Sequence, residues 1–230
     1  MNELLNNSVF FAVTVSLLGY EIGLFLKKKT KWAICNPLLI SIIIVIGVLL
    51  LSHIDYSYYE EGSTLLSYLL TPATVALAVP LYRQLAILKK YGVAIGLGVL
   101  SGVITSLVCT LVLAIIFNLN YEEYVTFLPK SITTAIGMGV SGELGGMVTI
   151  TVAVIVVTGI VGNVIGEGVC RLFHIREKVA IGLALGTSAH AVGTTRALEM
   201  GEVEGAMSSL AIVLAGMITV VGANVFSMLY

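Results

Sequence analysis

Long apolar runs alternate with short polar gaps along most of the 230-residue chain. A helix that crosses a membrane needs about 20 predominantly apolar residues. Runs of about this length predict spanning helices at 8–26, 33–52, 91–117, 147–169 and 206–229. The pattern therefore predicts an all-α integral membrane protein.

Three further apolar stretches are interrupted by prolines, glycines or polar residues. Residues 65–82 contain Pro72 and Pro80, and each proline removes a backbone donor and disturbs the preceding helical turn. Residues 129–146 are short, polar and rich in glycine, and residues 179–200 carry a polar run in their middle. We interpret all three as broken segments, so we expect six to eight transmembrane or re-entrant segments in a single membrane domain covering 1–230.

Composition supports a membrane protein and excludes several other classes. The chain is 58% hydrophobic and 11% charged, with a mean hydropathy of +1.04, whereas a soluble domain has roughly 25% charged residues. A net charge of -1 indicates no nucleic-acid partner. Cys35, Cys109 and Cys170 are far apart and form no CxxC pair, so neither a disulfide nor a metal site is expected. The N-terminal run lacks a basic flank and is expected to be a retained helix.

The charges of the loops predict an orientation in the cell membrane. Lysines crowd residues 27–31, and basic residues dominate 170–178, so both loops should face the cytoplasm and the N-terminus should lie outside. Residues 118–128 carry acidic side chains and should lie outside. An odd number of crossings must then separate 118–128 from 170–178, yet two candidate segments lie there. Either 129–146 is re-entrant or one of the charge biases misleads.

The interrupted segments also suggest an internal repeat. Superposing Pro72 on Pro129 aligns Thr74 with Ser131, and each broken segment precedes a long helix. Paired interrupted segments are typical of transporters whose substrate site lies at membrane depth, although short apolar repeats also match by chance. We therefore expect 129–146 and 186–196 to meet near the midplane, with residues 71–80 closing the site.

The polar run at 186–196 supplies the candidate chemistry. Polar groups at membrane depth are costly and usually face a cavity, a partner or a pathway. Arg196 offers a planar fork suited to a carboxylate, and His190 could carry a proton. With the hydroxyls of the broken segments they would bind a small organic anion, and the predicted substrate-binding residues are Thr74, Ser131, Thr133, Thr134, Thr187, Ser188, His190, Thr194, Thr195 and Arg196.

Each of these residues also has a purely structural interpretation. Arg196 could reach the interface or pair with Glu199 or Glu202, and His190 could be a packing histidine. A hydroxyl in a membrane helix often bonds to its own backbone. Three polar residues are candidates either for ion coupling and gating or for holding helices together: Glu143, Asn163 and Glu167.

Catalytic motifs are absent from the sequence. The three histidines lie in separate segments without an HExxH pattern, and no GxSxG elbow, P-loop or dinucleotide-binding unit is present. We expect no enzyme, no metal and no cofactor, with a proton or Na⁺ as the ion that would couple transport.

Three motifs resemble one known family. Residues 71–84 (TPATVALAVPLYRQ), 128–136 (LPKSITTAI) and 186–197 (GTSAHAVGTTRA) are similar to the LrgB/CidB family, and the similarity covers nearly the whole chain. The resemblance implies antiholin-like or holin-like control of murein hydrolases and autolysis, with a small holin-like partner of the LrgA/CidA type. It also implies a link to the plastid glycolate/glycerate translocator and to bacterial pyruvate transport.

Two functions from different classes follow from these observations. The first is alternating-access transport of small monocarboxylates such as pyruvate, glycolate or glycerate. The alternative is antiholin-like regulation of murein hydrolase export and autolysis together with a holin-like partner. Both place a multi-pass protein in the lipid bilayer of the plasma membrane, and the glycine-rich helix faces also suit a homo-oligomer.

Overall fold

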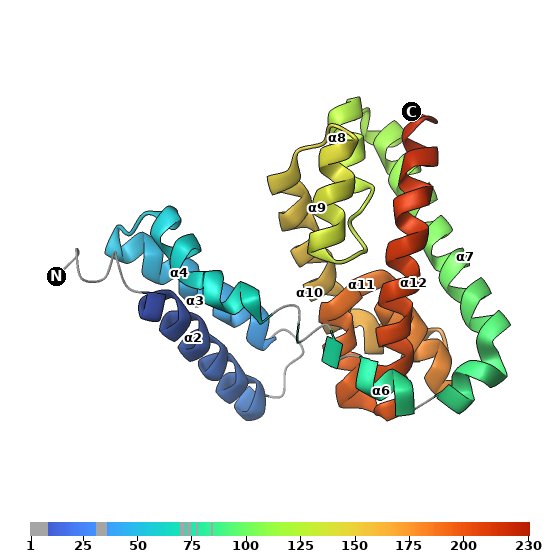
Figure 1. Cartoon of the computed structure of the whole chain (residues 1–230), viewed down its shortest axis with the longest axis horizontal. Helices are drawn as coiled ribbons and strands as arrows, with labels where there is room; N and C mark the ends of the chain where they lie inside the picture. The colour runs from blue at the N-terminus through green and yellow to red at the C-terminus, as the bar shows by residue number, and fades with distance from the viewer. Residues whose placement is uncertain (1–8, 31–35, 70–71, 73–74, 77, 84) are drawn as a thin grey trace. The chain divides into compact units, whose positions relative to one another are not determined.

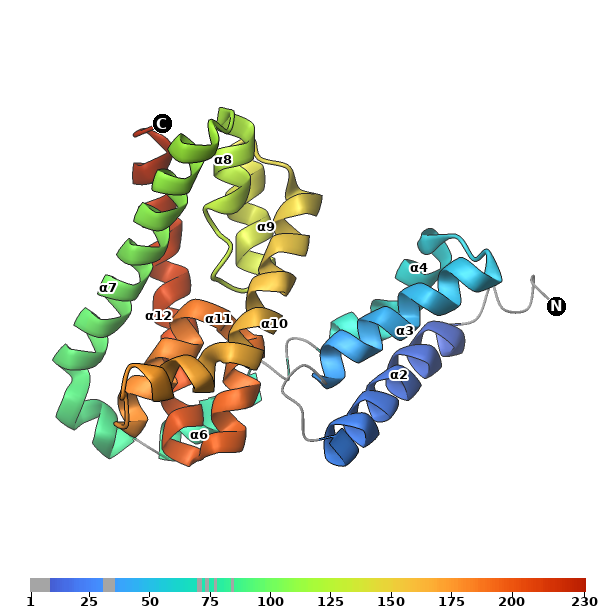
Figure 2. The same cartoon turned by 180° about the vertical axis from the view of Figure 1, so that it is seen from behind.

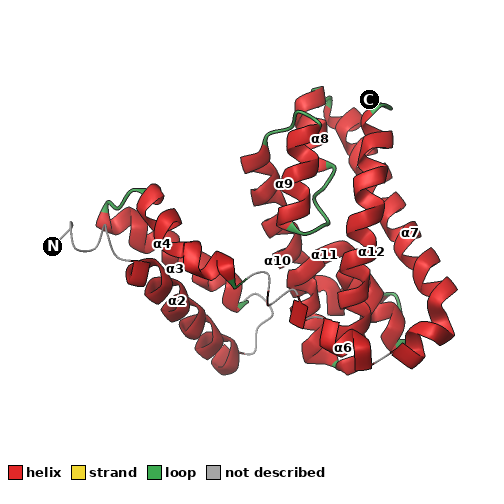
Figure 3. Cartoon of the chain, in the orientation of Figure 1, coloured by secondary structure: helices red, strands yellow, loops and turns green. Residues whose placement is uncertain are grey.

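The computed structural model describes residues 9–30, 36–69, 72, 75–76, 78–83 and 85–230. They form helices and loops, without any strand in these ranges (Figure 3). The chain divides into two compact units, residues 1–76 and 77–230. The predicted all-α class is therefore confirmed for the part of the chain that the structure describes.

The first unit contains α2 (Val9–Thr30), α3 (Pro37–Ser52) and α4 (Tyr56–Tyr68). Pro37 occupies the first turn of α3, where its missing N–H costs nothing, and the Asn36 side chain accepts from the N–H of Leu38. The hydroxyls of Ser16 and Tyr59 lie 2.8 Å apart and link α2 to α4. Helix α4 begins at Tyr56 because the Asp55 carboxylate caps it, accepting from the N–H of Ser57.

The second unit, residues 77–230, contains the remaining helices (Figures 1 and 2). They are α6 (Ala78–Arg83), α7 (Leu85–Phe117), α8 (Tyr121–Phe127), α9 (Thr134–Glu143), α10 (Val148–Leu172), α11 (Lys178–Met200) and α12 (Glu202–Ser227). In Figure 1, α7 and α12 run in the same direction and α10 runs against them. The expected loop at 118–128 is wrong, because Asn120 and Glu123 form a capping box that starts α8.

Four of the described helices are long and apolar enough to cross a membrane: Phe10–Thr30, Lys89–Phe117, Val148–Leu172 and Glu202–Ser227. A shorter apolar helix covers Pro37–Ser52. The chain is thus a membrane protein, but the expected count of six to eight segments is not confirmed. The interrupted segment 65–82 is divided between α4 and α6, and 70–71, 73–74 and 77 lie outside the described residues. The outside position of the N-terminus and the repeat built on Pro72 stay predictions.

Helix α11 is a hairpin, because its backbone breaks at Ala189 and His190. His190 has φ 42°, in the left-handed region that a non-glycine residue seldom adopts. The two arms, 178–188 and 191–200, then pack against each other, since Ile181 and Leu185 share one buried cluster with Ala197. Both ends of α11 therefore lie at the same end of the unit, as in a re-entrant segment.

Glycines let this hairpin approach its neighbours. A methyl group on Gly186 would clash with the carbonyl oxygen of Ser208 in α12, and one on Gly166 of α10 would lie 2.5 Å from Cδ2 of Leu185. A methyl group on Gly159 would lie 2.7 Å from Cε1 of His190. Because these helices approach closely, the break in α11 at His190 lies beside Gly159, near the middle of α10.

Helices α8 and α9 form a second hairpin that enters from the opposite end of the unit. A methyl group on Gly137 would lie 3.5 Å from the carbonyl oxygen of Pro129, so α9 folds back past the turn that joins it to α8. Tyr124 anchors the hairpin at its base by donating to the carbonyl of Phe226 over 3.0 Å. Burial raises the pKa of Tyr124 to about 12, so its hydroxyl stays protonated for this bond. This geometry fits the re-entrant alternative for 129–146.

Candidate functional site

The tips of the two hairpins, residues 128–133 and 186–190, lie one helical turn apart on α7. A methyl group on Gly102 of α7 would lie 2.8 Å from Cγ2 of Thr187. Four residues later, the Ser106 hydroxyl is 3.1 Å from that of Ser131 and accepts from Lys130 over 2.7 Å. Four residues of helix advance about 6 Å. The two segments that were expected to meet, 129–146 and 186–196, thus reach α7 at neighbouring turns, whereas 71–80 lies partly outside the described residues.

A pocket of about 1060 Å³ contains both tips. It extends along α7 from Tyr91 to Cys109, which is about 27 Å of helix. Its walls are mostly apolar, and its polar lining gathers toward the tips. The polar lining residues are Tyr91, Thr105, Ser106, Lys130, Ser131, Thr158, Glu177, Thr187 and Ser188.

Lys130 is the cation at the tip of the α8–α9 hairpin. Its ammonium lies 2.7 Å from the hydroxyl of Ser106 and 3.5 Å from that of Ser131. Among the described residues no carboxylate lies within ion-pair distance of it. Thr187 is 8% exposed, and its hydroxyl has no hydrogen-bond partner among the described residues. A positive charge thus lies at one end of a mostly apolar pocket, near a buried hydroxyl that has no partner among the described residues.

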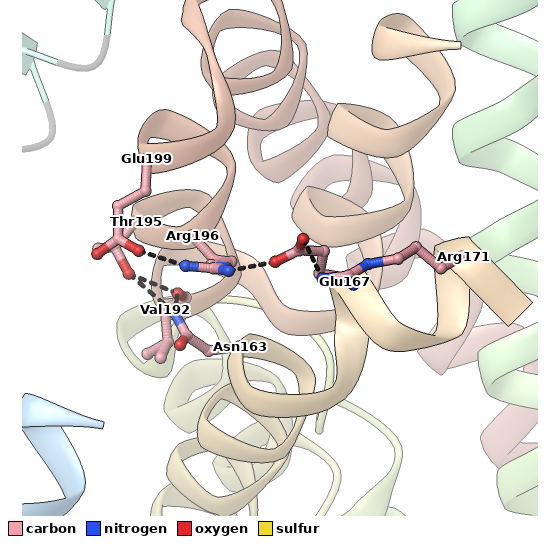
Figure 4. Close-up of polar contacts among 7 residues, drawn as sticks. All are labelled: Asn163, Glu167, Arg171, Val192, Thr195, Arg196 and Glu199. Carbon is pink, nitrogen blue, oxygen red and sulfur yellow. Dashed lines mark hydrogen bonds and ion pairs between the residues drawn. The ribbon is translucent and has the colours of Figure 1, made fainter. Parts of the chain in front are cut away.

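Arg196 lies elsewhere, in a charged cluster between the second arm of α11 and α10 (Figure 4). Its guanidinium donates to Glu199 over 2.7 Å and also to Glu167. Glu167 in turn accepts from Arg171. Two carboxylates therefore face the Arg196 guanidinium, and this arrangement matches the structural interpretation of Arg196, with Glu167 as an additional partner.

Asn163 lies beside this charged cluster and joins α10 to α11. Its side-chain amide donates to the carbonyl of Val192 over 2.7 Å and to the hydroxyl of Thr195 over 3.1 Å. These bonds hold the two helices together, which is the second of the two roles considered for Asn163 and Glu167.

His190 and Thr194 are buried within the packing of the α11 hairpin. Nε2 of His190 lies 3.0 Å from the carbonyl oxygen of Ile155. That oxygen can only accept, so Nε2 carries the hydrogen. The Thr194 hydroxyl contacts the His190 carbonyl at 3.0 Å and the Ser208 hydroxyl at 2.7 Å. Both side chains stabilise the break in α11.

The other predicted residues separate into three groups. Ser131, Thr187 and Ser188 line the pocket. Thr133 and Thr134 lie at the start of α9, Thr133 as its N-cap without a side-chain hydrogen bond, and neither lines the pocket. Glu143 is exposed at the end of α9, and Thr74 lies outside the described residues.

Sequence reasoning assigned no role to Lys130 or Ser106. A signal for the lysine was present, because Lys130 is the only Lys or Arg between Lys90 and Arg171. A solitary lysine in so apolar a stretch is a candidate for function on the same grounds as the polar run at 186–196.

Comparison with known proteins identifies relatives along nearly the whole chain. Residues 16–229 match the family model described as "LrgB-like family". The "Antiholin-like protein LrgB" of Bacillus subtilis is 36% identical over 220 residues, 95% of both chains. The "Holin-like protein CidB" of Staphylococcus epidermidis is 36% identical over 230 residues, 100% of both chains. No solved structure matches. These names agree with the lysis-control alternative better than with transport.

Proposed function

Because the chain belongs to the LrgB-like family, we propose that it is a non-enzymatic component of an antiholin-like or holin-like system in the plasma membrane. The similarity to LrgB and CidB relatives over 95% to 100% of the chain is the observation that carries this proposal. Their names concern holin systems, so we infer that a holin-like membrane protein is the partner and murein hydrolase activity the regulated output.

Deletion of the gene tests this function directly. We expect altered release of murein hydrolases and an altered rate of detergent-induced autolysis, measured by zymography and by the turbidity of the culture. Expression of the full chain should restore the parental behaviour. Unchanged autolysis and zymograms in the deletion strain would refute the proposal.

A second candidate, transport of small monocarboxylates, is favoured by the two opposed hairpins. Broken or re-entrant segments that meet at membrane depth are the usual construction of carrier sites, because irregular backbone is tolerated there only around a cavity. The pocket reaches from Tyr91 to the tips, where Lys130 and several hydroxyls lie. A proton or Na⁺ would be the coupling ion. Blocked acid flux would change the cytoplasmic pH, so both candidates could describe one activity.

Uptake of labelled pyruvate and glycolate into vesicles of purified protein separates the two candidates. Accumulation above that of protein-free vesicles supports a carrier. Protein that restores normal autolysis in cells but transports neither acid in vesicles would leave lysis control as the function. Co-reconstitution with the holin-like partner decides whether transport needs both chains.

A further inference from the structure

The end of the pocket at the two hairpin tips combines a positive charge with unused hydrogen-bonding capacity. We propose that this end binds one small organic monoanion, with the Lys130 ammonium as counter-charge and the hydroxyls of Ser106, Ser131 and Thr187 as hydrogen-bonding groups. The inference rests on the carrier candidate above and moves the anion-contacting role from Arg196 to Lys130.

The first argument for a bound anion is the charge balance of the pocket. An ammonium removed from water loses several kcal/mol of solvation unless a charge or enough dipoles replace it. An ammonium has three donors, and Lys130 directs them at two neutral hydroxyls, one of them 3.5 Å away. Glu177, the N-cap residue of α11, also lines the pocket but precedes Thr187 by ten positions, about 15 Å along the helix axis. An anion at the tips would supply the missing counter-charge.

The second argument for a bound ligand concerns Thr187 and is independent of Lys130. Its hydroxyl is buried and lacks a hydrogen-bond partner among the described residues. Buried hydroxyls without a partner are uncommon in folded proteins and call for a reason. Thr187 lines the pocket, so rotation of its side chain would bring the hydroxyl to a ligand oxygen to which it can donate. Residues from the tips of both hairpins would then contact the same ligand.

The single charge and the apolar walls define the ligand class. One ammonium balances one negative charge, so a dianion would leave an uncompensated charge in an environment of low dielectric. Leu183 and Ala184 of α11 line the pocket beside Thr187 and offer apolar contact to an alkyl group. An organic monoanion satisfies both conditions, whereas chloride and the phosphate monoanion satisfy only the first and succinate fails the first.

Cys109 provides a readout that does not depend on transport, because this exposed thiol lines the same pocket. In the full chain with Cys35→Ser and Cys170→Ser, the rate of Cys109 modification by N-ethylmaleimide is measured with acetate, pyruvate, chloride, succinate or phosphate at equal ionic strength. We expect acetate and pyruvate to slow the reaction, and the other three to leave it unchanged.

Variants assign the effect to the tips. Lys130→Gln should weaken the protection by pyruvate about tenfold or more, as expected for loss of a charge-assisted hydrogen bond. Thr187→Val should weaken it less, and Lys89→Gln, which removes an exposed lysine of the same helix α7, should leave it unchanged. Equal protection in Lys130→Gln and the parent, or the absence of protection by both organic monoanions, would overturn the proposal.

The outcome is separable from that of the carrier candidate. Pyruvate uptake into vesicles without protection of Cys109 would remove this site and leave transport standing. Protection of Cys109 that depends on Lys130, without any uptake, would establish the site and remove transport.

Discussion

Lys130 and Arg196 are both basic residues carried on a hairpin of the second unit, but among the described residues only Arg196 has carboxylate partners. Arg196 lies between Glu167 and Glu199 in the cluster of Figure 4. Lys130 contacts two hydroxyls and no carboxylate among the described residues. The comparison teaches that a cation in an apolar chain indicates an anion site only when its own structure leaves it without a counter-charge.

The position of each residue on its hairpin explains the difference. Arg196 lies on an arm, where α10 runs alongside and supplies Glu167. Lys130 lies at a tip, where the chain turns and the nearest groups come from α7. The arm that carries Arg196, residues 191–200, contributes no residue to the pocket lining, whereas both tips do.

Substitution of Gly186 tests the packing of the α11 hairpin, which holds Arg196 away from Lys130. Here we expect the largest loss of stability. In Gly186→Ala the new methyl group would meet the Ser208 carbonyl, a backbone atom that cannot move aside without displacing α12. We expect the free energy of unfolding to fall by about 2–3 kcal/mol, measured by denaturant unfolding in detergent micelles. The matched control is Gly96→Ala in α7, where no atom lies within 4 Å. It should be neutral or stabilising by up to about 1 kcal/mol. Equal effects in the two variants would show that α11 does not pack on α12 in this way.

The long helices could be predicted from the sequence because hydropathy alone decides them. The apolar run expected at 91–117 lies within α7, and that at 147–169 lies within α10 apart from its first residue. The polar helices α4 and α8 were missed because their composition resembles that of a loop. The Asn120–Glu123 capping box was a local signal that could have identified α8.

The site depended on contacts between distant segments and was predicted only in part. Ser131, Thr187 and Ser188 were predicted from polarity at membrane depth, and all three line the pocket. Polarity could not show that Glu167, 29 residues before Arg196, would neutralise it. Nor could it show that Ser106 of α7 would lie beside Lys130, since both pairings depend on tertiary packing.

Removal of the Arg196 charge should lower stability, whereas removal of the Lys130 charge should not. Arg196→Gln leaves Glu199 and Glu167 without their shared partner, and we expect a loss of about 1–2 kcal/mol, because the side chains are 30% and 26% exposed for Arg196 and Glu167. The double variant Glu167→Gln, Arg196→Gln should recover part of this loss. Lys130→Gln should leave the unfolding free energy unchanged or raise it, since Lys130 has no ion pair with any described residue. Thermal and denaturant unfolding of the purified variants measure both changes in unfolding free energy. A larger loss in Lys130→Gln than in Arg196→Gln would contradict the view that only Arg196 has a stabilising counter-charge.

Two threonines of α11 allow a similar comparison between a hydroxyl that has partners in the fold and one that has none. Here we expect the smallest effect on stability. Thr194 contacts the Ser208 hydroxyl and the His190 carbonyl, whereas the hydroxyl of Thr187 has no partner among the described residues. Valine keeps the shape of threonine and removes the hydroxyl. Thr194→Val should therefore cost about 1 kcal/mol, because it leaves Ser208 with one hydrogen bond fewer. Thr187→Val should cost nothing in the ligand-free protein and should weaken only the protection of Cys109 by pyruvate. If Thr187→Val destabilised the ligand-free protein as much as Thr194→Val, the Thr187 hydroxyl would have a partner within the fold and would not be free for a ligand.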